Sequence, residues 1–168
     1  MGYARFGDDC ADAAVPVRVF CHTPHNSSPI QPVWNRNVPA SAYTVYACNS
    51  VNAVPGQPTG SRKLCLSCHD GSIAVGGVLP RGRPIEMAGG ITTWPPGASN
   101  LGTDFSDDHS ISFRYDSDLV GRNPKLHDPG QLPQQTKLDP RQEMQCTSCH
   151  DAHNGQFGKF LVMDNANS

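Results

Sequence analysis

Two five-residue runs in this sequence combine residues that can bind a cofactor covalently: Cys65-Leu66-Ser67-Cys68-His69 and Cys146-Thr147-Ser148-Cys149-His150. Both have the spacing C-x-x-C-H, which is the attachment signature of a c-type haem. Two thiols at this spacing add across the two vinyl groups on one edge of the porphyrin. The histidine that follows then lies under the macrocycle, where an imidazole nitrogen can bind the iron. The motifs therefore predict two covalent haems, with thioether bonds from Cys65, Cys68, Cys146 and Cys149 and axial ligands from His69 and His150.

A third, incomplete copy of the motif precedes the two intact ones. The segment 18–26 aligns with 146–154, and the alignment matches a Cys-His pair, a histidine three residues later and the asparagine after it. Arg18 stands where the first cysteine would be. We interpret this segment as a third haem site, held by Cys21 and with His22 as an axial ligand, because the match continues beyond the dipeptide.

The seven histidines allow the iron ligands to be counted. Three haems with two imidazoles each need six, so the chain can saturate every iron and keep one histidine spare. An iron that binds oxygen or reduces a small molecule needs an open coordination position, which a bis-His haem lacks. The count therefore favours electron transfer, and we expect no enzymatic activity. The candidates for the second axial positions are His25, His109, His127 and His153.

Two of these candidates, His25 and His153, each lie three residues after a motif histidine. The two axial ligands of one iron approach opposite faces of the ring, so neither candidate can share an iron with the histidine before it. If either binds iron, it binds a different haem, and two haems then lie close together. A neighbouring carboxylate accompanies both His109 and His127 and can orient the ring of each. With imidazoles in surplus, we expect Met87, Met144 and Met163 to be packing residues.

The two remaining cysteines leave two alternatives open. In the first, Cys10 is the missing partner of Cys21 in an expanded site, and Cys48 stays free. In the second, Cys21 alone holds the first haem, and Cys10 pairs with Cys48 in a disulfide. We favour the second, because a lone thiol is a liability in an exported protein. Both alternatives keep the expected number of haem c groups at three.

The rest of the sequence must position these sites, and it predicts little regular structure. The chain has 168 residues, which fits a single domain over 1–168. With 16 glycines, 15 prolines and a hydrophobic fraction of 37%, its peptide core would be thin, whereas haems bring large apolar surfaces. We therefore expect a mostly irregular, loop-rich multihaem cytochrome c fold. It would have short helices at the haem sites, a small two-stranded β element and a core of stacked haems.

Four segments have recognisable patterns. The segment 41–48 is rich in Tyr, Thr and Val and predicts a strand. Apolar residues alternate with polar ones over 111–116, which predicts a half-buried strand that pairs with 41–48. Short helices are expected over 62–69 and 141–150, each carrying one intact motif.

Charge and hydropathy limit the partners and the location of the protein. The formal charge of −2 favours neither nucleic acid nor an anionic membrane, and the haem propionates would make the protein more acidic. No apolar run is long enough for a transmembrane helix. No signal peptide follows Met1, so we expect either a mature form or a true start upstream. Thioether attachment is normally made outside the cytoplasm, and seven cysteines fit the same oxidising side of a membrane.

The motifs resemble those of the doubled-CxxCH multihaem c-type cytochromes. The likeness extends in order from about residue 17 to 160 and covers most of the chain. Two departures bear on the haem count: Arg18 replaces the first binding cysteine, and residues 1–17 contain no histidine, although members often carry a ligand there. The similar segments are 20–25 with 32–36 for the first haem, 64–71 for the middle haem, 108–112 for a distal-histidine strand and 146–154 for the last haem.

The resemblance implies electron transport at or beyond the cell surface. Some similar small cytochromes polymerise head to tail into extracellular filaments, with haem contact from subunit to subunit. It therefore implies a homopolymer whose partners are further copies of the chain, other redox proteins or extracellular electron acceptors. Two alternatives remain: a monomeric periplasmic electron shuttle, and the haem subunit of a multihaem reductase, which would need a five-coordinate iron.

Overall fold

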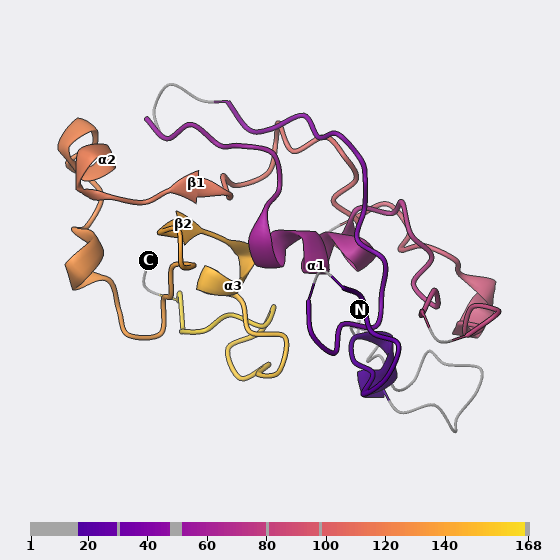
Figure 1. The fold of residues 1–168 in the computed structure, drawn as a ribbon. Helices are drawn as coiled ribbons and strands as arrows, with labels where there is room; N and C mark the ends of the chain where they lie inside the picture. The colour runs from indigo at the N-terminus through magenta and orange to yellow at the C-terminus, as the bar shows by residue number, and fades with distance from the viewer. Residues whose placement is uncertain (1–16, 30, 48–51, 80, 98, 167–168) are drawn as a thin grey trace. The chain divides into compact units, whose positions relative to one another are not determined.

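A computed structural model describes residues 17–29, 31–47, 52–79, 81–97 and 99–166 (Figure 1). Most of this chain is irregular, with short helices and one small antiparallel sheet, which confirms the predicted peptide architecture. Cys10 and Cys48 lie outside the described residues, so the predicted disulfide and the expanded site lie outside them too. The elements are the 3₁₀ helix η1 (Val17–Phe20), α1 (Gly60–His69), η2 (Ala88–Gly90), β1 (Phe113–Arg114), α2 (Ser117–Arg122), η3 (Pro129–Gln131), β2 (Glu143–Met144) and α3 (Cys146–Cys149).

The chain divides into two compact units, each built from two separate segments. The first unit contains Met1–Ser41 and Leu64–Thr103, and the second contains Ala42–Lys63 and Asp104–Ser168. The boundary between them falls within α1. The incomplete motif and the middle motif therefore belong to the first unit, and the last motif belongs to the second. Among the described residues, no helix has both the length and the apolar composition needed to cross a membrane.

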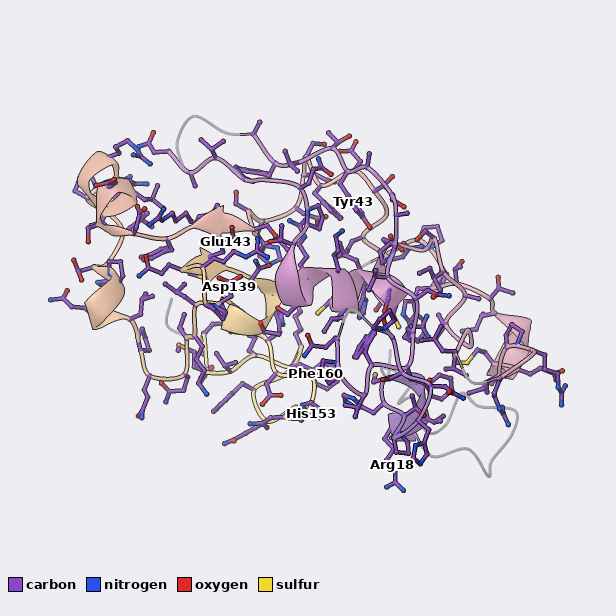
Figure 2. All side chains as sticks on the ribbon, viewed as in Figure 1. Arg18, Tyr43, Asp139, Glu143, His153 and Phe160 are labelled. Atoms are coloured by element: carbon purple, nitrogen blue, oxygen red, sulfur yellow. The ribbon has the colours of Figure 1, made fainter. Side chains whose placement is uncertain are left out.

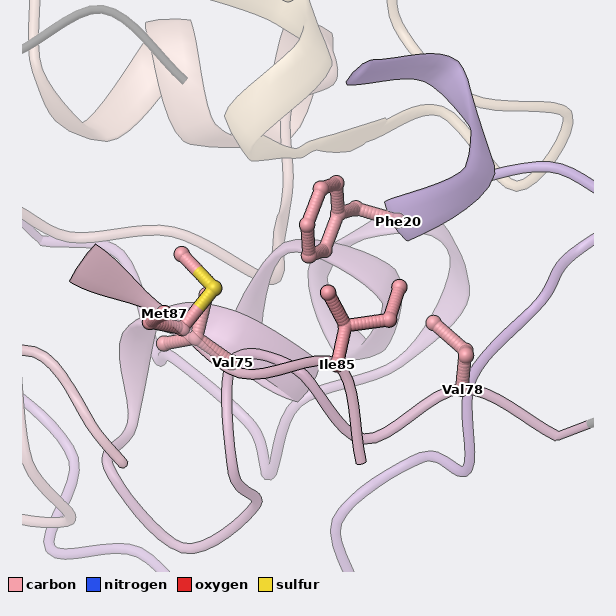
Figure 3. Close-up of a cluster of buried hydrophobic side chains, with 5 residues drawn as sticks. All are labelled: Phe20, Val75, Val78, Ile85 and Met87. Carbon is pink, nitrogen blue, oxygen red and sulfur yellow. The ribbon is translucent and has the colours of Figure 1, made fainter. Parts of the chain in front are cut away.

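The first unit is organised around five buried apolar side chains (Figure 3). Phe20 enters this core from η1, directly before the Cys21-His22 pair, and Cys21 packs against it. The backbones of Gly76 and Ile85 approach closely, with Ile85 N–H donating to Gly76 O at 2.8 Å. A Cβ at Gly76 would lie 1.9 Å from Ile85 O, so only glycine fits there. The core consists of Phe20, Val75, Val78, Ile85 and Met87.

The second unit has its own core beside β1. Phe113, Tyr115 and Leu119 are buried, and Met144 of β2 packs against them. The apolar positions predicted over 111–116 are thus on the inner face, as their alternation indicates. Strands β1 and β2 pair antiparallel, with Phe113 opposite Met144 (Figure 1).

The predicted pairing of 111–116 with 41–48 is wrong. Over the described part, 41–47, the chain forms only an isolated parallel bridge between Thr44 and Asp104. The side chain of Gln57 takes the place of a strand partner: Tyr43 N–H donates to its Oε1 at 3.0 Å, and its Nε2 donates to Tyr43 O at 2.8 Å. The Tyr43 ring stacks on Phe105 with centroids 4.9 Å apart, which anchors this segment without a ladder.

The helix predictions agree in part with the structure. The helix predicted over 62–69 is confirmed, and it begins two residues earlier, at Gly60. The helical turn predicted over 141–150 is shorter, because β2 occupies part of that range and the helix starts only after Gln145. Helix α2 was not predicted. Its signal is Asp116, whose carboxylate accepts from Leu119 N–H as an N-cap.

Candidate functional site

The middle motif lies on the last turns of α1. Cys65 is half-buried and Cys68 is buried. The ring Nδ1 of His69 lies 2.7 Å from the backbone oxygen of Ser99. A carbonyl oxygen can only accept, so Nδ1 carries the hydrogen and Nε2 keeps its lone pair. His69 is therefore held in the tautomer that can bind iron through Nε2.

The last motif fixes its histidine in the same way. α3 contains Cys146 and Cys149, and His150 directly follows the helix. The Nδ1 atom of His150 lies 2.8 Å from the backbone oxygen of Lys159. Two intact motifs in different units thus share one arrangement, in which a later loop carbonyl holds the motif histidine and leaves Nε2 available.

The incomplete first motif has the same backbone arrangement as the last one. His150 forms an antiparallel bridge with Leu161, and His22 forms an antiparallel bridge with Trp34. In the last motif, Asp151 N–H donates to Phe160 O at 2.7 Å, and Val162 N–H donates to Cys149 O at 3.0 Å.

The equivalent hydrogen bonds around His22 complete this correspondence. Thr23 N–H donates to Val33 O at 2.9 Å, and Asn35 N–H donates to Cys21 O at 2.9 Å. The residue before the bridge partner is left-handed in both copies, with φ of 57° at Val33 and 58° at Phe160. Such values are uncommon for bulky residues. The likeness predicted from the sequence between 18–26 and 146–154 therefore extends to the returning backbone of each copy.

Arg18, at the position of the missing cysteine, is exposed on η1 (Figure 2). The first copy consequently presents a single motif thiol. Cys21 is half-buried against the core, and burial raises the pKa of its thiol while the charge of Arg36 lowers it.

The second unit brings two predicted iron ligands together. The rings of His109 and His150 have centroids 6.4 Å apart and planes inclined at 59°. Burial lowers the pKa of His109, and the imidazole of His150 lowers it further. His109 is therefore neutral near pH 7, which is the form that binds metals.

All four second-ligand candidates, His109 included, have exposed side chains. The backbone oxygen of His25 accepts a hydrogen bond from the Thr23 hydroxyl at 2.7 Å, and the His25 side chain is exposed. His127 accepts a hydrogen bond from the Tyr115 hydroxyl at its backbone oxygen, 2.8 Å away. His153, labelled in Figure 2, lies with its Nδ1 3.3 Å from Asp151 Oδ1.

Several features beside these histidines fit an apolar cofactor with acidic substituents. Trp34 Nε1, next to the His22 ring, and Ser110 Oγ, next to His109, are buried without a hydrogen-bond partner in the described structure. Such donors suit propionate oxygens. In the residues described, no group of three or more His, Cys, Asp or Glu side chains can hold a metal ion, and a haem iron needs only two axial ligands. An open hollow of about 470 Å³ is lined by Tyr46, Asp107, Asp108, His109, Ser110 and Phe113.

Comparison with known families agrees with the motifs. Residues 139–168 match the family model described as the doubled CXXCH motif. This range contains α3, the last motif and its returning segment. The match supports the doubled-CxxCH multihaem cytochrome family that the sequence resembles, and it indicates covalently bound haem c. No curated protein matches the chain.

Proposed function

We propose that this protein is a trihaem c-type cytochrome that carries electrons through bis-His haems as a subunit of an extracellular filament. The observation that carries the proposal is the pairing of His109 with His150 in the second unit. The match to the doubled CXXCH motif supports the broader assignment to electron transfer.

The separation of the two rings matches that of an axial pair. Imidazoles on opposite sides of one iron place their ring centroids about 6.4 Å apart, since each nitrogen lies about 2.0 Å from the metal. The ring centroids of His109 and His150 lie 6.4 Å apart. In this proposal, both rings ligate the haem attached at Cys146 and Cys149. When bound, the haem supplies one-electron cycling between ferric and ferrous iron, and two imidazoles leave no position for a substrate.

The proposed haem count rests on the correspondence between the first and last copies of the motif. Cys21 would form a single thioether bond, and His22 would ligate that iron. Intact-mass spectrometry tests the count: we expect three haems per chain and the loss of one in Cys21→Ala. Two haems in the unmodified protein would contradict the Cys21 site. A gain of two protons after thiol reduction would support the bond between Cys10 and Cys48.

Visible spectra test the electron-transfer function directly. We expect all haems to be low-spin and the ferrous spectrum to stay unchanged when carbon monoxide is added, because each iron has two imidazole ligands. A high-spin fraction that binds carbon monoxide would contradict the proposal and favour the reductase subunit.

The filament is supported by the surplus of histidines and by the exposure of the second-ligand candidates. His25, His127 and His153 are accessible, so one of them can serve a haem of a neighbouring copy. Negative-stain microscopy of native material from the cell surface tests this part of the proposal. Filaments are expected, whereas discrete particles alone would exclude them and favour the periplasmic shuttle.

A further inference from the structure

Arg36 is a charged side chain with no exposed surface inside the first unit. Its guanidinium donates to three backbone oxygens. Nη2 lies 2.8 Å from Ser67 O and 2.8 Å from Ala74 O, Nε lies 3.3 Å from Ser67 O, and Nη1 lies 2.5 Å from Val75 O. Ser67 is in the last turn of α1, where the backbone oxygens lack helical partners, so Arg36 caps this helix end. These contacts explain how the chain tolerates a buried cation.

Within the part of the chain that the structure describes, Arg36 forms no ion pair with an acidic side chain. Carbonyl groups satisfy its donors but carry no net charge, and an arginine side chain stays protonated in proteins. Among the described residues, the ion pairs formed by arginines are those of Arg83 with Glu86 and Arg114 with Asp116. The buried carboxylate of Asp70 accepts hydrogen bonds from Ser72, whose Oγ lies 2.7 Å from Oδ1 and whose backbone N lies 2.8 Å from Oδ1.

The guanidinium lies beside two of the proposed haem attachment sites. Ser67, which accepts two of its hydrogen bonds, stands between Cys65 and Cys68 in the middle motif. Asn35, the residue before Arg36, donates its N–H to Cys21 O at 2.9 Å.

A fixed positive charge changes the redox equilibrium of a nearby iron. Reduction adds one electron to ferric iron and gives ferrous iron, with no bond made or broken at the ligands. The ferric state carries one more positive charge, so a buried cation destabilises it relative to the ferrous state. Because Arg36 is buried, solvent and salt screen its charge weakly.

We propose that Arg36 raises the reduction potential of the haems attached at Cys21 and at Cys65 and Cys68. This inference rests on the proposed function, because it requires those haems. In this proposal, Arg36 acts on the reduction potentials through its fixed positive charge and does not bind iron.

The test is a spectroelectrochemical titration of the haem-loaded full chain, after mass spectrometry has established the haem count. Arg36→Gln keeps a hydrogen-bond donor without the charge, and Arg36→Lys keeps the charge. Arg83→Met is the matched control, because Arg83 belongs to the same unit and its side chain is 85% exposed. Arg36→Gln is expected to lower at least one midpoint potential by about 59 mV, a tenfold change in the ferrous-to-ferric ratio. Arg36→Lys and Arg83→Met are expected to stay near the unmodified protein.

The outcomes separate this inference from the proposed function. If Arg36→Gln titrates like Arg83→Met, or if Arg36→Lys shifts as far as Arg36→Gln, the charge of Arg36 does not set the potential. If Arg36→Gln does not fold, Arg36→Met replaces it as the uncharged variant, and midpoint potentials equal to those of Arg83→Met overturn the inference. A protein with no haem at Cys65 and Cys68 would overturn the proposed function as well.

Discussion

At the residue scale, a histidine's role depends on the group that holds its Nδ1 atom. His69 and His150 both present Nδ1 to a backbone oxygen, of Ser99 and Lys159 respectively. These acceptors are more than eight residues away in sequence, and no side-chain pattern marks them. The C-x-x-C-H spacing predicts which histidines bind iron, whereas the loop carbonyls that fix their tautomers become visible only in the structure.

Removing His109 tests the proposed axial pair. His109→Ala takes away one imidazole and leaves His150 and both thiols of the last motif in place. We expect one haem per chain to become high-spin and to bind carbon monoxide, with the haem mass unchanged. Visible and electron paramagnetic resonance spectra of the purified protein would measure both effects.

The same substitution in a second background assigns the iron. In Cys146→Ala/Cys149→Ala protein the last haem is not attached, so adding His109→Ala should produce no further high-spin signal. A high-spin signal that appears in this background would mean that His109 ligates another haem. An unchanged spectrum of the single variant would contradict any role of His109 as a ligand.

At the element scale, the last motif is positioned by a network around one buried glutamine. Gln145 is 1% exposed and caps α3 in a capping box with Ser148. Its Nε2 donates to Glu143 Oε2 at 3.0 Å and to Asp139 Oδ2 at 3.2 Å, two residues labelled in Figure 2. Ser112 Oγ donates to Gln145 Oε1 at 3.2 Å, which ties the residue before β1 to the N-cap of α3.

Replacing Gln145 should therefore destabilise the second unit. Gln145→Ala leaves the carboxylates of Asp139 and Glu143 without this donor and removes the helix cap. We expect a loss of about 1–3 kcal/mol in the free energy of unfolding, measured by chemical denaturation. The exposed Gln134→Ala is the matched control and should change stability by less than about 0.5 kcal/mol. Equal effects of the two substitutions would argue against the network.

A glycine pair offers a comparable test in the first unit. Gly76→Ala would press a Cβ against Ile85 O, whereas a Cβ at Gly82 meets nothing within 4 Å. We expect Gly76→Ala to lower the thermal midpoint and to cost about 1–3 kcal/mol, because backbone cannot yield as a side chain does. Gly82→Ala should be neutral or slightly stabilising. A neutral Gly76→Ala would show that the segment carrying Ala74 and Val75 can rearrange freely.

The sequence predicts a helix or strand correctly where neighbouring residues determine it, and fails where groups distant in the sequence determine it. The helix over 62–69 and the inner face of 111–116 follow from local composition and alternation. The strand over 41–48 fails because the Gln57 side chain satisfies the backbone of Tyr43, a contact that strand propensity does not include. The pairing of His109 with His150 joins residues 41 positions apart. The sequence therefore identifies both histidines as candidate ligands, but it does not predict that they lie together.

At the scale of the whole molecule, the peptide alone has little apolar interior. Within the described residues, seven apolar side chains are buried in the first unit and six in the second. Cores of this size bury much less apolar surface than a domain of this length usually needs. The proposed haems would supply the missing surface, and the half-buried thiols of Cys21, Cys65 and Cys146 lie where that surface would attach.

Stability should therefore depend on haem attachment. Protein produced without haem attachment, with all its cysteines kept reduced, should lose its near-ultraviolet circular dichroism and bind a hydrophobic dye, as collapsed states without fixed packing do. Calorimetry would measure the effect of each motif separately. Cys146→Ser/Cys149→Ser should lower the thermal midpoint of the second unit, and Cys65→Ser/Cys68→Ser should lower the thermal midpoint of the first unit. Each unit has its own core, so the two losses should be separable. A haem-free chain that unfolds cooperatively at the midpoint of the loaded protein would show that the small peptide cores suffice and that haem serves electron transfer alone.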